Sequence, residues 1–349
     1  MVESCLEEWN IEGIFTLTVD NASSNDVAIS YLKESTNMWK GIVLGNEFVH
    51  VRCCAYILNL IMTDGLKHHN KSIDRVRHVI RYVKASPNRL QTFKWCVDKV
   101  KIESKAILCL DVATRWNSIY KMLENAEKFE HTFKRMEYED FDYILHFWDG
   151  DYDRRPPNEN DWETYRKFVK FLKLFYNAIE KLSGSLYVTS NAFFEEIHMI
   201  KRKIDLFSRS KDHFLYSMAK KMKEKFDKYW GSGEDSSKEG NVLLYVVVVL
   251  DPRKKLDYLN YCLSNLYGEN VAKDITDLVK GALECLYKHY NSTHSSYVSI
   301  QSASEISKME SVDVDNDNDD DPDKFIVFQY KAFRQGKQSV GCVDEVAKY

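Results

Sequence analysis

The sequence predicts a mixed α/β fold that is mostly helical. Two short stretches near the start of the 349-residue chain have strand character. In Phe15 to Val19 apolar and hydroxyl-bearing side chains alternate, which is the period of a half-buried strand. The apolar stretch Phe48 to Arg52 predicts a second strand. From about residue 70 onward, apolar side chains recur every three or four positions, as they do in amphipathic helices.

The first section is expected to alternate between helices and strands. Asp20 stands directly after the first strand and before the small polar residues of a turn. In order, we expect a helix with Leu6, Trp9 and Ile11, the strand before Asp20, a helix near Val27 to Leu32, the strand Phe48 to Arg52, and a helix over Ala55 to Leu66.

The rest of the chain predicts a series of helices. The first is amphipathic and basic, and it ends before Pro87. Its apolar residues are Ile73, Val76, Ile80 and Val83, and its cations, expected on the opposite side, are Arg75, Arg77, Arg81 and Lys84. Asp111 or Thr114 can cap a helix that begins near Arg115. Further apolar stripes predict helices over Trp162 to Leu182, Phe193 to Phe207, Phe214 to Trp230 and Ile275 to Tyr287.

Composition limits the class of protein. Hydrophobic residues make up 44% of the chain and charged residues 29%, so the chain can bury a large core and form more than one folding unit. No apolar run reaches the roughly 20 residues that span a bilayer, and the first residues lack the pattern of a signal peptide. We therefore expect a soluble, intracellular protein without a membrane partner. The eight scattered cysteines, with no Cys-x-x-Cys, predict reduced thiols and no metal site.

Charge is distributed unevenly. The net charge is -4, and the run from Glu310 to Asp323 holds eight acidic residues and no basic one, which leaves +4 for the remainder. Such a tail is consistent with regulation of nucleic-acid contact, because it would compete for the same positive surface. The simpler interpretation is a solvated linker.

Asp20 has two possible roles. A lone carboxylate at the carboxyl end of a strand is well placed to bind a metal ion. Asp20, Asn21 and Ser23 are also good capping residues for the helix that follows.

Several segments in a fixed order resemble hAT-superfamily transposases of plants, in particular the Ricesleeper-type proteins that begin with a BED-type zinc finger. The segments are Thr16-Leu-Thr-Val-Asp-Asn-Ala-Ser23, Phe48 to Ile61, Leu110-Asp-Val-Ala-Thr-Arg-Trp-Asn117, Ser183 to Asn191, Phe226-Asp-Lys-Tyr-Trp230 and Val249-Leu-Asp-Pro-Arg253. The resemblance implies a ribonuclease H-like core in which two Asp and one Glu hold Mg²⁺ for DNA cleavage. Asp20 matches the second of these acids.

The chain departs from the family at three places. The 19 residues before Asp20 contain no match for the first acid, and the chain stops near Val343, where the resemblance places the start of the segment with the final Glu. Tyr56 stands where the family has the His of a Cys-x-x-His element. Two-metal catalysis requires several carboxylates around cations roughly 3.5–4 Å apart. We therefore expect a truncated chain that is not an enzyme, retains no Mg²⁺ and uses no cofactor.

The resemblance also implies a domain organisation. We expect a partial ribonuclease H-like core over residues 1–67, a large all-helical insertion domain over 68–295, and an acidic, disordered tail over 296–349 that leads to a dimerisation region. Leu243 to Leu250 is rich enough in β-branched residues for a strand, but the family favours a helix there, which we expect.

Four residues are candidates for DNA contact. In the family the Trp of the Arg-Trp-Asn motif stacks on an extruded base, which makes Trp116 the match and Arg115 a phosphate partner. His50 and Arg52, close to Asp20, are further candidates. We expect an inactive transposase-like protein of the nucleus with residual DNA-binding or regulatory function and no small-molecule substrate. The alternative is a helical scaffold that pairs with full-length relatives without binding DNA.

Overall fold

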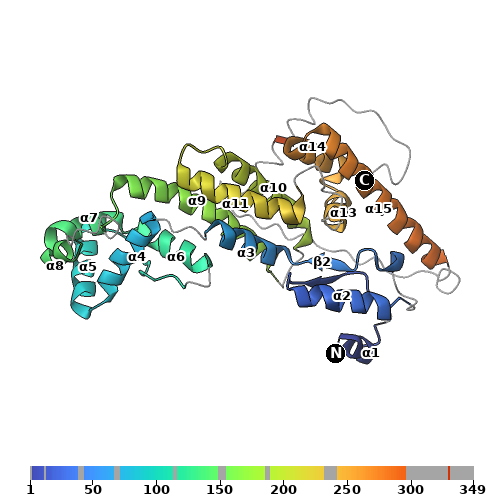
Figure 1. Cartoon of the computed structure of the whole chain (residues 1–349), viewed down its shortest axis with the longest axis horizontal. Helices are drawn as coiled ribbons and strands as arrows, with labels where there is room; N and C mark the ends of the chain where they lie inside the picture. The colour runs from blue at the N-terminus through green and yellow to red at the C-terminus, as the bar shows by residue number, and fades with distance from the viewer. Residues whose placement is uncertain are drawn as a thin grey trace. The chain divides into compact units, whose positions relative to one another are not determined.

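The computed structural model describes residues 2–11, 13–37, 43–66, 71–112, 116–147, 155–184, 189–231, 242–295 and 329–330. Over these residues the chain is mostly helical and contains one two-stranded sheet, as Figure 1 shows. The predicted mixed α/β, mostly helical class is therefore confirmed. The chain divides into two compact units, of which unit 1 holds Met1–Ile57, Leu182–Arg202 and Phe226–Tyr349, and unit 2 holds Leu58–Lys181 and Lys203–Lys225.

The sheet of unit 1 is parallel. Strand β1 (Leu17–Val19) pairs with β2 (His50–Arg52) in a register that places Thr18 opposite Val51. Helix α2 (Ser23–Ser35) lies between the strands in sequence, followed by the short 3₁₀ helix η1 (Leu44–Asn46). Helix α1 (Val2–Glu8) precedes β1. A small core forms where Ile14, Leu32 and Val49 meet, with Leu6 and Leu17 packed against them.

The second part of unit 1 is helical. It contains α13 (Leu243–Leu250), α14 (Lys255–Tyr267) and α15 (Glu269–Ser295), and α14 packs along α15. The apolar octet of α13 is a helix, as the family resemblance predicted. Tyr330 is buried against α14, with its ring centroid 5.1 Å from that of Tyr258. The rest of the predicted acidic tail lies outside the described residues.

Unit 2 is built from helices alone within the described residues. Its elements are most of α3 (Cys54–Gly65), α4 (Lys71–Lys84), α5 (Pro87–Val100), α6 (Trp116–Glu127), α7 (Glu130–Glu139), α8 (Phe141–Phe147), most of α9 (Glu159–Leu182), and parts of α10 (Ser190–Phe207) and α11 (His213–Trp230). Helices occur at each predicted place, but their ends differ. Helix α1 ends at Glu8, before the predicted Trp9 and Ile11, and α15 extends beyond the predicted Ile275 to Tyr287 at both ends.

The break between α4 and α5 has a local cause. Ser86 caps α5, because its hydroxyl accepts a hydrogen bond from the backbone N–H of Arg89 at 3.3 Å. Pro87 occupies the first helical position, where its missing N–H costs nothing. The predicted end of the preceding helix before Pro87 is therefore confirmed.

One prediction about charged residues is wrong. Arg75 does not lie on a solvent-facing basic side of α4, because its guanidinium is buried in an ion pair with Asp161 of α9 at 2.6 Å. Asp111, one of the two candidate caps of α6, accepts from Arg77 Nε at 2.9 and 3.0 Å and from Nη2 at 2.8 Å, the bidentate geometry typical of Arg and carboxylates. The other candidate, Thr114, lies outside the described residues, so the cap of α6 stays a prediction.

The compact units group the chain differently from the predicted domains. Leu182–Arg202 and the chain from Phe226 onward belong with the strands, whereas the prediction placed residues 68–295 together in a helical insertion. The borders of evolutionary domains are not defined by this packing, so the boundaries at 67 and 295 stay predictions.

Candidate functional site

Asp20 and Cys53 emerge at the same end of the sheet. The N–H of Leu17 donates to the carbonyl of Val49 at 2.6 Å, and the N–H of Cys53 donates to the carbonyl of Val19 at 2.8 Å. Since both strands run in the same direction, their carboxyl ends coincide, and ligand sites of α/β sheets lie at that edge. This edge is the candidate functional site.

The Asp20 carboxylate is exposed but already engaged. Its Oδ1 accepts a hydrogen bond from the Ala22 backbone N–H at 3.0 Å and another from Asn25 Nδ2 at 2.6 Å. The Asn25 amide also donates to the Asp20 carbonyl at 3.3 Å. Asp20 thus holds the turn that leads into α2. The expectation that Asp20, Asn21 or Ser23 caps this helix is wrong, because Ala22 occupies the N-cap position and no side chain caps the helix.

Arg52 ends β2 next to Cys53, whereas His50 begins this strand opposite Leu17, at the other end of the strand pair from Asp20. An Nη atom of Arg52 lies 3.9 Å from Asp26 Oδ1, and both side chains remain open to solvent. Burial lowers the pKa of His50, the positive charges of Arg52 and Lys33 lower it further, and Asp26 opposes them. His50 is therefore neutral near pH 7. Of these two candidates, only Arg52 offers a positive charge to a phosphate at that pH.

The residues present do not fit the Mg²⁺ that the resemblance implies. Mg²⁺ favours octahedral coordination by several hard oxygen ligands. Asp20 supplies one carboxylate, and its Oδ1 already receives two N–H donors. Across the described parts of the chain, no group of three or more His, Cys, Asp or Glu side chains could hold a metal ion. Burial raises the pKa of Cys54 to about 12. A sulfur ligand would in any case suit softer metals than Mg²⁺.

Trp116 belongs to unit 2 and is buried, with 6% of its surface exposed. It starts α6, and its indole N–H donates to Asn59 Oδ1 on α3. The ring packs in the core in this conformation, so contact with a base would require the segment to open. Arg115 lies outside the described residues. The DNA-contact roles of both residues stay predictions.

A buried polar pair in unit 1 was not expected from the sequence. The pair joins Lys254, which stands in a run of three cations after Asp251-Pro252, to Glu195. The Lys254 ammonium is largely buried, binds the buried carboxylate of Glu195 and lies 3.4 Å from the Asn191 carbonyl. The signal available in the sequence was the pair of acids Glu195 and Glu196 within the apolar stripe Phe193 to Ile197, and both are buried.

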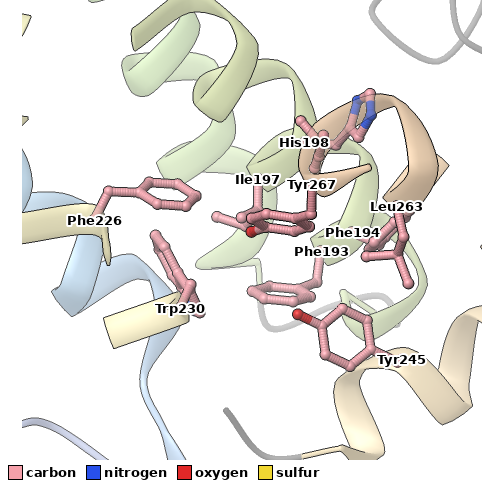
Figure 2. A pocket seen from close by; sticks show the side chains of 10 residues that line it. Phe193, Phe194, Ile197, His198, Phe226, Trp230, Tyr245, Leu263 and Tyr267 are labelled. Atoms are coloured by element: carbon pink, nitrogen blue, oxygen red, sulfur yellow. The ribbon is translucent and has the colours of Figure 1, made fainter. Parts of the chain in front are cut away.

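The same part of unit 1 contains a small apolar hollow of about 20 Å³. Figure 2 shows the rings of Phe193, Tyr245 and Tyr267 gathered around it. The other lining residues are Phe194, Ile197, His198, Phe226, Trp230, Leu263 and Leu266. This space suits about one water molecule, whereas ligand pockets usually hold roughly 300–1,000 Å³. The hollow is therefore a packing feature and not a substrate site.

His198 makes the stability of unit 1 depend on pH. Burial lowers its pKa to about 4, the charge of Arg202 lowers it further, and the backbone of Cys262 acts in the opposite direction. In the unfolded chain the pKa of His198 is 6.5, so the unfolded state binds the proton more readily than the folded state does. Above pH 6.5 the lowered pKa of His198 therefore does not reduce the free energy of unfolding. The reduction grows as pH falls and reaches about 3 kcal/mol near pH 4. Urea midpoints measured from pH 7 to pH 4 should fall more steeply for wild type than for His198→Leu. Parallel curves would contradict this assignment, because all other titrating groups are common to both proteins.

Two family models match the chain. The ZBED1 RNase-like helical domain matches residues 51–171, and the hAT-like transposase, RNase-H fold, matches residues 191–290. The second match falls on residues that were predicted to belong to the helical insertion. No solved structure matches the chain significantly. None of the described helices combines the length and apolar character needed to cross a membrane.

Similar proteins occur in plants. The chain is 32% identical over 291 residues to the zinc finger BED domain-containing protein RICESLEEPER 2 of Oryza sativa subsp. japonica, covering 83% of this chain and 38% of that protein. It is 31% identical over 287 residues to "Putative AC transposase" of Zea mays, covering 82% and 34%. The chain thus spans less than two fifths of the length of these relatives. The two domain matches and the relatives confirm the predicted resemblance of this chain to hAT transposases and Ricesleeper-type proteins.

Proposed function

We propose that this polypeptide is a catalytically inactive relative of hAT transposases that retains a DNA-binding or regulatory role in the nucleus. The claim of catalytic inactivity rests on the contacts of the Asp20 carboxylate. This carboxylate serves the turn before α2, and no other acid among the described residues joins it in a metal-binding group.

The chemistry of strand cleavage explains why one carboxylate is insufficient. In two-metal phosphoryl transfer, one cation activates the attacking oxygen and the other stabilises the leaving oxygen. Tyr56 adds no compensating group, because a phenol does not carry protons near neutral pH as an imidazole does. The partly buried thiols of Cys53 and Cys54 prefer softer metals than Mg²⁺.

Cleavage assays test this proposal. Incubation of the chain with Mg²⁺ or Mn²⁺ and nicked or hairpin DNA should give no product above that of an Asp20→Ala control. Metal-dependent cleavage by wild type that is lost in Asp20→Ala would overturn the assignment. The Asp20→Asn variant keeps the turn geometry and separates loss of a metal ligand from loss of the helix start.

The sequence similarity between this chain and its relatives supports DNA binding and a nuclear location. The relatives named above are called BED zinc finger proteins or a transposase, and such proteins act on DNA in the nucleus. The remainder of the chain outside Glu310 to Asp323 carries a net charge of +4, which favours a polyanionic partner.

A protein-interaction scaffold is the second candidate. Val27 and Tyr31 lie four residues apart on α2, and both are exposed large apolar side chains. Residues at this spacing share one helix face, which suits pairing with another protein such as a full-length relative. Mobility-shift assays with DNA and pull-down assays with a tagged full-length relative distinguish the candidates, because the scaffold would bind only the latter.

A further inference from the structure

We propose that the exposed side of α5 is a contact surface for single-stranded DNA, with Trp95 as the residue on which a base stacks. This inference rests on the proposed DNA-binding function and names the residues that would perform it. The surface consists of Lys94, Trp95 and Lys99 on α5, Lys101 just after it, and Arg135 on α7. None of these residues belongs to the strand edge, and Trp116 is not among them.

Charge is concentrated around this helix. Residues 81–105 contain seven Lys and Arg and two acids, a net charge of +5 in a chain whose total is -4. Lys94, Lys99, Lys101 and Lys105 are all exposed. Two cations of α4 behave differently, since Arg75 and Arg77 are bound to Asp161 and Asp111. The positive field of this region therefore comes chiefly from α5 and the segment after it.

Trp95 is unusual in being open to solvent. It is 43% exposed, although Trp is highly buried on average in folded proteins. The Lys99 ammonium lies 5.3 Å from its ring centroid and the Arg135 guanidinium 5.7 Å. An indole held between cations offers a flat apolar surface for a base with positive charge for the adjoining phosphates, which is the combination used by single-strand-binding proteins.

The core beneath this surface holds it in place. Phe93, on the buried side of α5, packs against Phe129 and Phe133 with ring centroids 5.4 and 5.5 Å apart. The two helices that carry Trp95 and Arg135 are therefore fixed against each other. Arg135 also pairs with Glu139 at 2.8 Å, which orients the guanidinium along α7.

One residue on the surface opposes binding. Asp98 is exposed on α5, three positions from Trp95, and its carboxylate would repel a nearby phosphate. Duplex DNA buries its bases in the stack, whereas unpaired strands present their faces to an aromatic ring. The exposure of unpaired bases makes single-stranded DNA the partner. Replacement of Trp95 should therefore weaken binding, whereas removal of the Asp98 charge should strengthen it.

Fluorescence anisotropy with a labelled oligothymidylate and with a duplex of equal length tests the proposal on the full chain. We expect Trp95→Ala to weaken single-strand binding about tenfold, Trp95→Phe to restore most of it, and the duplex to bind more weakly than the single strand. Lys99→Gln should reduce the slope of log affinity against log salt by about 0.7. Asp98→Asn should bind more tightly than wild type. Trp9→Ala, which removes another exposed Trp, is the matched control and should bind like wild type.

The outcomes separate this inference from the proposed function. If wild type binds DNA and both Trp95→Ala and Asp98→Asn bind equally well, the α5 surface is not the site, while the DNA-binding function stands. If wild type binds neither probe, both proposals fail. Competition by polyglutamate at equal charge concentration, with no effect of Trp95→Ala, would identify a surface for acidic proteins and overturn the inference.

Discussion

Replacement of Asp161 by alanine is expected to lower the free energy of unfolding of unit 2 by about 3–5 kcal/mol. The Asp161 carboxylate lies 2.6 Å from Arg75 Nη1 and 2.8 Å from Arg155 Nη1, and less than a tenth of the Arg75 and Asp161 side chains is exposed. Removing the acid leaves the Arg75 charge buried without its counterion. Desolvation of that charge, more than loss of the attraction itself, causes the destabilisation.

Asp161 also contributes to the start of α9. Its Oδ2 accepts from the Asn158 backbone N–H at 3.0 Å, and its own N–H donates to Asn158 Oδ1 at 2.9 Å. These reciprocal bonds satisfy two N–H groups at the helix start, as in a capping box. Asp161→Asn keeps an acceptor there but not the charge, so its cost should be intermediate.

Urea unfolding followed by circular dichroism at pH 7 provides the measurement. Glu163→Ala is the matched control, because this acid lies two residues further along the same helix in an exposed pair with Lys167. Its midpoint should equal that of wild type. The double variant Arg75→Met with Asp161→Ala should recover part of the loss, since it removes the uncompensated charge as well. Equal midpoints for Asp161→Ala and Glu163→Ala would show that the ion pair is not buried in solution.

The second large effect is expected at Trp116. Truncation of a buried Trp to Ala typically costs about 3–5 kcal/mol, because packing is lost and a cavity remains. The cost here includes the Asn59 side chain, which would lose its indole donor. Trp116→Phe keeps most of the apolar volume and should destabilise less, while Asn59→Ala should cost about 1–3 kcal/mol.

Stability and DNA affinity measured on the same variants separate the two interpretations of this residue. If Trp116 is a packing residue, Trp116→Ala lowers the urea midpoint strongly, and binding below the unfolding transition is retained. If it stacks on a base, as the family implies, Trp116→Ala weakens DNA binding and leaves the midpoint near that of Trp95→Ala. The exposed Trp95 is the natural comparison, since its truncation creates no cavity.

The predicted elements agree with the structure where local pattern controls conformation. The alternation in Phe15 to Val19 predicted β1, and the apolar stripe from Trp162 predicted α9, because both patterns record which backbone period buries one face. Leu243 to Leu250 shows the limit of that reasoning. Its valines favour a strand in isolation, but the segment is a helix that buries Val246, Val248 and Val249 against its neighbours. Only the resemblance to a family predicted this correctly.

Charged residues could not be placed from the sequence. Arg75 and Asp161 are 86 positions apart, and Lys254 and Glu195 are 59 apart. Helical periodicity assigns an arginine or lysine to the solvent side by default, and it does so correctly for Arg81. A cation turns inward only when a distant acid compensates its desolvation, and no local pattern contains that information.

The amino-acid sequence by itself determined the resemblance to hAT transposases, the mostly helical class, and the position of Asp20 at the end of a strand, because motif order and side-chain periodicity are properties of contiguous residues. Tertiary structure alone decided that the Asp20 carboxylate is held by Asn25, that Trp116 is buried, and that Trp95 stands exposed between cations. The physical reason is that the burial and the partners of a side chain depend on which parts of the chain pack together. The same charged or aromatic side chain can stabilise the fold in one environment and destabilise it in another.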